Sequence, residues 1–370
     1  MGLKKISTRQ LIIFFCIYSF SIKFLTLPQL LSRGAGNDAW ISALVGTIIE
    51  LLLIWLVLNV LVKGRDSDIY SDLRNKLTGV GAKSIILLMF LLLGLQLLIL
   101  MWTSFTLTNE NLFASINKHL FILPLLVFGV LFCFVPARAI FRSGEVFYIL
   151  IIVALALSVL PVIPQMRPAE VTPILANGFG PILNTVYRNL IYFESVAFLL
   201  IFSGDIKLDK DFKKKFMSIA ALIGIFFVFF VFMFQSLFGP LAEYKSIAIA
   251  NLAIYTKFLT QGGRLDWVLI CIWLLLLLLR FGVTFFASFA CIRYIFNLKH
   301  RAGYIGFGIA ISLYFIFLFV LNTKTRLDNF IITVAPVIAA IFILIPLISF
   351  LCAILARSKK KTSRKEVENV

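Results

Sequence analysis

Ten mostly apolar stretches, each about 20 residues or longer, follow one another along the chain and constrain its fold more than any other feature. A stretch of this length can cross a bilayer as an α-helix, in which the backbone polar groups are hydrogen-bonded within the same segment. The chain is 61% hydrophobic, whereas soluble domains are about 45–50% apolar. We therefore predict an all-α integral membrane protein with about ten transmembrane helices. The predicted spans are residues 8–31, 38–62, 84–108, 121–141, 144–163, 182–204, 216–238, 265–292, 303–322 and 329–355.

The net charge of +18 arises mostly in the segments between the apolar stretches. If the N-terminus is cytoplasmic, 24 of the 35 lysines and arginines fall in cytoplasmic segments and 8 in outer segments. Such an asymmetry predicts that both termini are cytoplasmic, and it explains the basic charge without a nucleic-acid partner, which we do not expect. Residues 1–355 then form a single polytopic transmembrane domain. Residues 356–370 form a basic cytoplasmic tail, which we expect to be disordered and to contact membrane lipid.

The sequence carries no enzyme signature. It contains no phosphate-binding loop with its lysine, no GxSxG or HExxH motif and no haem-attachment motif. The 5 cysteines lie in apolar stretches without a CxxC motif or a Cys/His cluster, and the 2 histidines lie far apart. We therefore expect no enzymatic activity, no cofactor and no metal.

Four charged residues, Lys23, Glu50, Glu194 and Arg280, fall near the middle of four different spans. A charge at the bilayer centre costs at least roughly 2.5–3.5 kcal/mol, so these groups should face the protein interior and have partners there. Their signs allow a Lys23–Glu50 pair and a Glu194–Arg280 pair. The pairs can be structural struts between helices, or they can form part of a ligand site, and the sequence leaves both interpretations open.

Polar residues interrupt the first and sixth spans near mid-depth. The first span combines serines and a lysine with Pro28, and the sixth contains the run Tyr192–Ser195. Non-helical backbone at that depth is tolerated where it lines a cavity, and broken helices of this kind mark transporter binding sites, although a proline-kinked helix is an alternative for the first span. The candidate ligand-binding residues are Ser19, Ser21, Lys23, Tyr192, Glu194, Ser195 and Arg280, with Glu50 as the charge partner of Lys23.

Two outer segments, residues 164–181 and 239–263, are longer than a simple turn. Long loops on one face act as lids in some proteins and as plain connectors in others, and the sequence fits both. We expect a ligand to enter between these segments and to contact the first, sixth and eighth spans. The second segment contains a helical pattern around Ser246–Leu259, and Ser7 with Gln10 forms a capping-box pattern at the start of the first span.

Several motifs together resemble one membrane-protein family. They are KISTRQL at the start of the first span, GAGNDAWIS at residues 34–42, PILANGFGPIL at residues 173–183 and YFESVAFLLIF from Tyr192. The chain resembles, over almost its whole length, the B-subunit family of spore-germination nutrient receptors (GerAB-like). That family is part of the amino acid–polyamine–organocation transporter superfamily.

The resemblance implies a LeuT-type fold, a 5+5 inverted repeat with broken helices 1 and 6 around a small-molecule site. It also implies a germinant-receptor subunit that binds a small, amino-acid-like nutrient and signals germination. Its partners would be an A subunit and a lipoprotein C subunit, in the spore inner membrane or the bacterial plasma membrane. The alternative is a proton-coupled secondary transporter for an amino acid or amine.

The chain departs from the family pattern at both breaks. Ser21 and Lys23 stand where the family often has a Gly-x-Gly, and Tyr192 stands where a glycine usually precedes the Phe-Glu pair. Lys23 can replace a bound cation, contact the ligand carboxylate or plug the site. The sequence does not separate these three roles.

Overall fold

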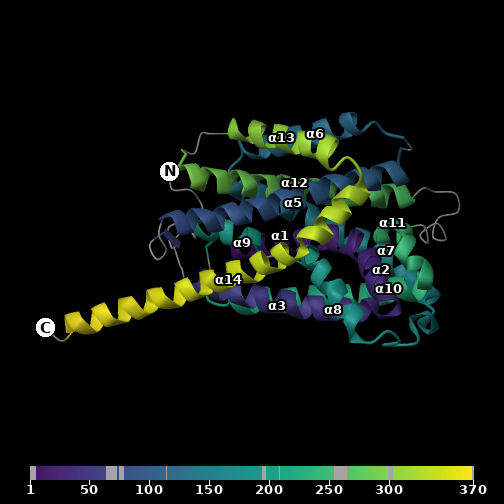
Figure 1. The fold of residues 1–370 in the computed structure, drawn as a ribbon, viewed down its shortest axis with the longest axis horizontal. Coiled ribbons are helices and arrows are strands. Elements are labelled where there is room, and N and C mark those ends of the chain that lie inside the picture. The colour runs from purple at the N-terminus through teal and green to yellow at the C-terminus, as the bar shows by residue number, and fades with distance from the viewer. Residues whose placement is uncertain are drawn as a thin grey trace.

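The computed structural model is built of helices, and Figure 1 shows them packed into one elongated bundle. It describes residues 6–63, 73–74, 79–113, 115–193, 197–207, 209–253, 265–298 and 303–368. Within these ranges the only strand-like pairing is an isolated parallel bridge between Ile6 and Ile206. The α-helices are α1 (Thr8–Leu25), α2 (Leu27–Ala35), α3 (Ala39–Lys63), α5 (Gly79–Asn111), α6 (Lys118–Phe132), α7 (Ala137–Val159), α8 (Phe179–Arg188), α9 (Ala197–Ile201), α10 (Phe212–Phe238), α11 (Ala248–Ala253), α12 (Leu265–Phe296), α13 (Ile305–Phe315) and α14 (Lys324–Glu368).

Each of the ten predicted spans contains at least one of these helices. In the described part of the chain, 7 helices are long and apolar enough to cross a membrane. The fourth and ninth spans correspond to shorter apolar helices, Lys118–Phe132 and Ile305–Val320. The sixth span is divided between α8 and α9.

The first span breaks at Thr26, between α1 and α2. Pro28 lies in the first turn of α2, where its missing N–H removes no helical hydrogen bond, whereas in a continuous helix its ring would clash with the preceding turn. The expectation that the break includes Ser21 and Lys23 is wrong, because both residues lie in regular helix. The Ser21 hydroxyl donates to the Tyr18 carbonyl 2.7 Å away, so it is satisfied within α1.

The sixth span also loses regular α-helix in its middle. Helix α8 ends at Arg188, a 3-10 helix follows at Leu190–Phe193, and α9 begins at Ala197. Residues 194–196, which include two of the predicted site residues, lie outside the described residues. The predicted interruption of the sixth span is therefore present up to Phe193, the last residue described before residues 194–196.

Helices that hold the same position in the order of spans within each half of the chain pack against each other. Helix α3 packs on α10, α5 on α12 and α6 on α13, which pairs spans two, three and four with spans seven, eight and nine. Such pairing is what a 5+5 repeat produces. Figure 1 shows α6 and α13 as an outer layer beside α5 and α12, and α14 crossing the bundle obliquely and extending beyond it.

Three local predictions have clear outcomes. The capping box at Ser7 and Gln10 is confirmed, with both reciprocal hydrogen bonds present. The fourth and fifth spans separate at residues 133–136 rather than near residue 142, because Pro136 begins α7 as its N-cap. The expected disorder of the tail is wrong, since α14 continues as helix to Glu368. Extending an existing helix needs no new nucleus, and lysine and arginine are good helix formers.

The helical pattern at Ser246–Leu259 is confirmed where it is described, as α11. The remainder, from residue 254, lies outside the described residues. The long segment before α8 contains two short 3-10 helices, Leu160–Gln165 and Pro168–Val171. The second contacts the 3-10 helix Gly239–Tyr244, so parts of the two expected lid segments lie against each other.

Candidate functional site

A polar cavity of about 460 Å³ lies between α2, α8 and α14, beside the interruptions of the first and sixth spans. The charge distribution predicts this end of the bundle to be extracytoplasmic. Broken helices with a polar cavity at the break are the arrangement by which transporter folds expose backbone groups to a ligand. The lining residues are Leu30, Arg33, Gly34, Asn184, Thr185, Arg188, Asn189, Tyr192, Thr325, Asp328, Asn329, Ile331 and Ile332.

A close approach of α2 and α8 forms one wall of the polar cavity. A Cβ atom at Gly34 would overlap the side chain of Thr185, so glycine is required for this spacing. The Thr185 hydroxyl donates to the Pro181 carbonyl at 2.6 Å, and the Asn189 amide donates to the Thr185 carbonyl at 2.8 Å. These donors are therefore used within the wall itself.

Charged side chains of both signs line the polar cavity. Arg33 and Arg188 come from the broken spans, and Asp328 comes from the first turns of α14. Arg33 and Lys324 lie close enough to Asp328 for their positive charges to attract its carboxylate. Guanidinium groups bind carboxylates through paired hydrogen bonds, and a carboxylate accepts from an ammonium group, so the cavity suits a zwitterion.

Tyr192 and Asp328 also line a second, much smaller cavity of about 10 Å³. This volume is about that of one water probe. The small cavity reaches the break at Thr26, whose hydroxyl oxygen is buried and has no hydrogen-bond partner among the described residues. Tyr192 and Asp328 thus line both the polar cavity and this much smaller cavity at the break. The other lining residues of the small cavity are Ile99, Trp102, Thr103, Thr106, Ile247, Lys324 and Leu327.

Arg280, which is buried, joins α12 to α1 below the break. Its Nη1 donates to the Tyr18 carbonyl at 2.6 Å and to the Ser21 hydroxyl at 2.9 Å, and its guanidinium carbon lies 3.9 Å from the centre of the Tyr18 ring. The Tyr18 hydroxyl donates to Gln96 on α5 at 2.7 Å. The predicted partner Glu194 lies outside the described residues, so the Glu194–Arg280 pair stays a prediction.

Lys23 forms an ion pair with Glu50 of α3, the partner that charge balance predicts. Both side chains are buried, and the Lys23 Nζ lies 5.4 Å and 4.9 Å from the ring centres of Phe193 and Phe227. Ser21 and Lys23 are two residues apart on α1, about 200° around the helix, so they face opposite directions.

The predicted site residues therefore occupy separate places. Ser21 meets Arg280, Lys23 meets Glu50, and Tyr192 lines the polar cavity. Ser19 is buried on α1, and Ser195 lies outside the described residues. None of the residues that line the polar cavity comes from α12, and five of them come from α14 in the tenth span. The expected contact of a ligand with the eighth span stays a prediction.

Sequence reasoning missed the cavity's charged groups. Arg188 and Asn189 are adjacent polar residues inside a predicted span, which is a signal that could have identified them. Asp328 lies just before the predicted start of the tenth span and resembles an ordinary interfacial residue. No local pattern distinguishes it, because its position against α2 depends on how α14 packs.

Solved structures show the same architecture. The first is MHP1, a nucleobase-cation-symport-1 family transporter in a closed conformation with bromovinylhydantoin bound, at a TM-score of 0.59 and 13% identity, covering 93% of this chain and 78% of that chain. The second is MhsT in complex with L-phenylalanine, at a TM-score of 0.58 and 13% identity, covering 96% of this chain and 99% of that chain. These are LeuT-type transporters, so the predicted fold with broken helices 1 and 6 is confirmed.

Sequence comparison gives the family. Among curated proteins the chain is similar to spore germination protein KB of Bacillus subtilis (strain 168), with 24% identity over 233 residues, which is 60% of this chain and 60% of the relative's length. The family model described as spore germination protein matches residues 5–328, a range that includes α2, α8 and the Asp328 carboxylate of the polar cavity. The chain therefore belongs to the spore germination protein family and is a multi-pass membrane protein of the LeuT-type fold.

Proposed function

We propose that the chain is the nutrient-binding membrane subunit of a spore germinant receptor, and that its ligand is a small amino acid or a close analogue. The observation that carries the proposal is the polar cavity between α2, the break of the sixth span and α14, with Arg33, Arg188 and Asp328 as charged groups of both signs. An amino acid presents one carboxylate and one ammonium group, which complement this set. One structural neighbour was solved with an amino acid, L-phenylalanine, which agrees with this ligand class.

Binding proceeds in two steps in this proposal. The ligand first enters the polar cavity, where its carboxylate meets Arg33 and Arg188 and its ammonium group meets Asp328. Its side chain then displaces Tyr192 and reaches the break, where the unpartnered hydroxyl of Thr26 supplies a hydrogen-bonding group. The ligand shifts the protein toward the closed state only by its greater affinity for that state, so these added contacts at the break drive closure.

The signal passes to partner subunits in this proposal. We expect an A subunit and a lipoprotein C subunit to contact the cytoplasmic segments, among them the basic segment that ends at Lys215. Co-purification of these subunits with the tagged chain would support the partnership. A chain that purifies from spores without either subunit would contradict it.

The binding site is tested by thermal stability. The purified protein in lipid nanodiscs is heated in the presence of each free amino acid, because a ligand that binds the native state raises the melting temperature. Asp328→Asn removes a charged hydrogen-bond acceptor worth about 1.5–3 kcal/mol, so the Kd of the ligand should rise by about 10- to 100-fold. Glu243→Gln is the matched control, since it removes an acidic group near α2 that does not line the cavity.

Two outcomes would contradict the placement of the site. One is a melting curve that no amino acid shifts. The other is an Asp328→Asn protein that melts as wild type does without ligand and keeps the wild-type Kd. An equal loss of affinity in Glu243→Gln would indicate a general effect of surface charge instead of a cavity contact.

Secondary transport is the alternative function, favoured by the fact that both structural neighbours are transporters. In this alternative, coupling to protons would involve the buried Lys23–Glu50 pair or Glu194. Uptake of a labelled amino acid into proteoliposomes, stimulated by an imposed proton gradient, would support transport. Saturable binding without uptake would support the receptor.

A further inference from the structure

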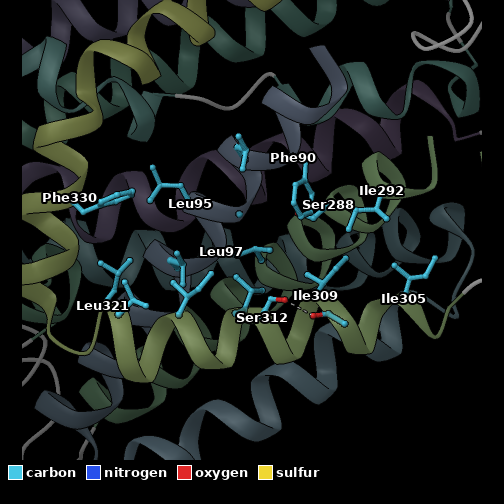
Figure 2. Close-up of a pocket in the computed structure, with 17 residues that line it drawn as sticks. Phe90, Leu95, Leu97, Ser288, Ile292, Ile305, Ile309, Ser312, Leu321 and Phe330 are labelled. Atoms are coloured by element: carbon cyan, nitrogen blue, oxygen red, sulfur yellow. Dashed lines mark hydrogen bonds between the residues drawn. The ribbon is translucent and has the colours of Figure 1, made fainter. Parts of the chain in front are cut away.

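A larger, apolar cavity of about 660 Å³ lies between α13 and the pair formed by α5 and α12. Figure 2 shows Ile305, Ile309 and Ser312 in a row along α13, with Leu321 beyond its end and lining residues of the other helices facing them. The 5-residue π-helical turn that follows α13, Ile316–Val320, and Phe330 of α14 complete the lining. This apolar cavity is distinct from the polar cavity, with which it shares no lining residue.

Among the residues that the structure describes, the apolar cavity offers no free hydrogen-bond donor from a side chain. Its two polar lining residues are Ser288 and Ser312. The Ser288 hydroxyl donates to the Thr284 carbonyl at 3.0 Å, and the Ser312 hydroxyl donates to the Gly308 carbonyl at 2.9 Å. Apolar cavities without polar partners stay dry, so the occupant that fits is hydrocarbon.

The apolar cavity opens toward the bilayer side of the bundle. Leu91, Val320 and Phe330 line it and are 56%, 61% and 45% exposed. Exposed apolar residues of a membrane-spanning helix face lipid tails, since water is excluded at that depth. A hydrocarbon chain from the bilayer can therefore enter sideways.

The apolar cavity is long enough for a hydrocarbon chain and too small for a helix. The apolar segment Ile305–Val320 beside it is about 24 Å long at about 1.5 Å per residue. A helix of that length with its side chains is about 10–12 Å across and therefore occupies about 1,900 Å³ or more, whereas all the space between atoms at this cavity is about 1400 Å³. A transmembrane helix of a partner subunit would therefore cover the opening without entering the space.

Two glycines keep the space open from opposite walls. Gly94 of α5 and Gly308 of α13 both line the apolar cavity, and a Cβ atom at either position would meet no atom within 4 Å. The π-helical turn adds to the space because it widens the helix at Ile316 and Val320, and such turns occur frequently at functional sites.

We propose that a bilayer phospholipid inserts one acyl chain into the apolar cavity and forms part of the packing of α13 against α5 and α12. Helix α13 packs mainly on α6, so the acyl chain supplies the contacts that α13 lacks on its inner side. The chain is then a lipid-binding protein at this second site, whatever ligand the polar cavity takes.

Filling the apolar cavity tests the proposal. The protein is purified in mild detergent and bound phospholipid is counted by native mass spectrometry, with Gly94→Leu and Gly308→Leu as the filling variants. A leucine side chain at either position would occupy the space that the acyl chain fills, so we expect the filling variants to carry several-fold less bound phospholipid than the wild type. Gly79→Leu is the matched control, since Gly79 begins the same helix as Gly94, has open space at its Cβ and does not line the cavity.

The proposal is overturned if the wild type carries no phospholipid, or if the filling variants retain it at the level of Gly79→Leu. A filling variant that fails to fold is recognised by its elution as aggregate, and the second glycine then provides the test. A phospholipid with a diazirine in its acyl chain gives an independent measurement in bilayers. With the label assigned to single residues by fragmentation, we expect it at Leu95 and Ile309, while equal labelling at Phe307 and Ile311, outside the cavity, would indicate bulk lipid only.

Crosslinking in intact membranes distinguishes a partner helix from lipid as the occupant of the apolar cavity. A photoreactive benzoyl-phenylalanine in place of Phe330, an aromatic residue at the opening of the apolar cavity, should capture phospholipid. Capture of another protein as the main product would overturn the proposal in favour of a subunit interface.

Discussion

The Lys23–Glu50 ion pair gives the sharpest test of how the bundle is held together near the helix break. Lys23 is 1% and Glu50 4% exposed, and the pair joins α1 to α3. Lys23→Met keeps the length of the side chain and removes its charge, which leaves the Glu50 carboxylate buried without the ammonium group. Glu50→Gln removes the other charge, and the double variant removes both.

The expected changes in the free energy of unfolding follow from the burial of both charged groups. Removing one member of a buried pair costs about 3–5 kcal/mol, because the remaining charge has lost its compensation. Lys23→Met also loses the contacts of its Nζ with Phe193 and Phe227, worth about 0.5–2 kcal/mol. The double variant buries no charge at this place, so it should cost no more than the worse single variant. The coupling energy should therefore be about 3 kcal/mol, at the upper end of measured values.

A double-mutant cycle measures this coupling. The free energy of unfolding is obtained for all four proteins by titrating mixed micelles with a denaturing detergent and following helix content and aromatic fluorescence. If the two single effects add to the double effect within about 0.5 kcal/mol, the reasoning is refuted, since independent sites behave in this way.

Two further predictions test neighbouring contacts. Arg280→Met should lower the free energy of unfolding by about 2–5 kcal/mol, because the hydrogen bonds of a buried guanidinium to Tyr18 and Ser21 are lost. Arg280→Lys should recover only part of this loss. The same detergent titration measures both variants. Gly46→Ala should cost about 1–3 kcal/mol by overpacking, because its Cβ would overlap the Phe193 ring, and the double variant with Phe193→Leu should recover stability. An unchanged Gly46→Ala protein, or a double variant no more stable than the single one, would contradict this packing.

The spans and the two interrupted helices were predictable from local signals, whereas the 5+5 arrangement was predicted only from the family resemblance. Apolar stretches long enough to cross a bilayer predicted ten spans, and each contains helix. The interruption of the first span follows from Pro28, whose effect on the preceding turn depends on its own ring. The exact place of the break was wrong by several residues, because serine hydroxyls that look disruptive in sequence, such as that of Ser21, bond back to their own helix.

The candidate site was predictable only in part. Polar residues at the sixth break identified Tyr192, and charge balance identified the Lys23–Glu50 pair. Neither signal could show that Ser21 and Lys23 face different neighbours, because that depends on which helices pack on the two sides of α1. The charged groups of the polar cavity come from three segments far apart in the chain.

The sequence by itself determined the class of the protein, its spans and the two interrupted helices, since hydrophobic length and backbone chemistry act over a few residues. Only the tertiary structure decided which polar groups meet. Close contacts such as Gly34 with Thr185 and Gly46 with Phe193 fix how α2, α3 and the sixth span approach one another. Rotation and offset of packed helices depend on these long-range fits, and they bring Asp328 to the broken helices while turning Lys23 toward Glu50.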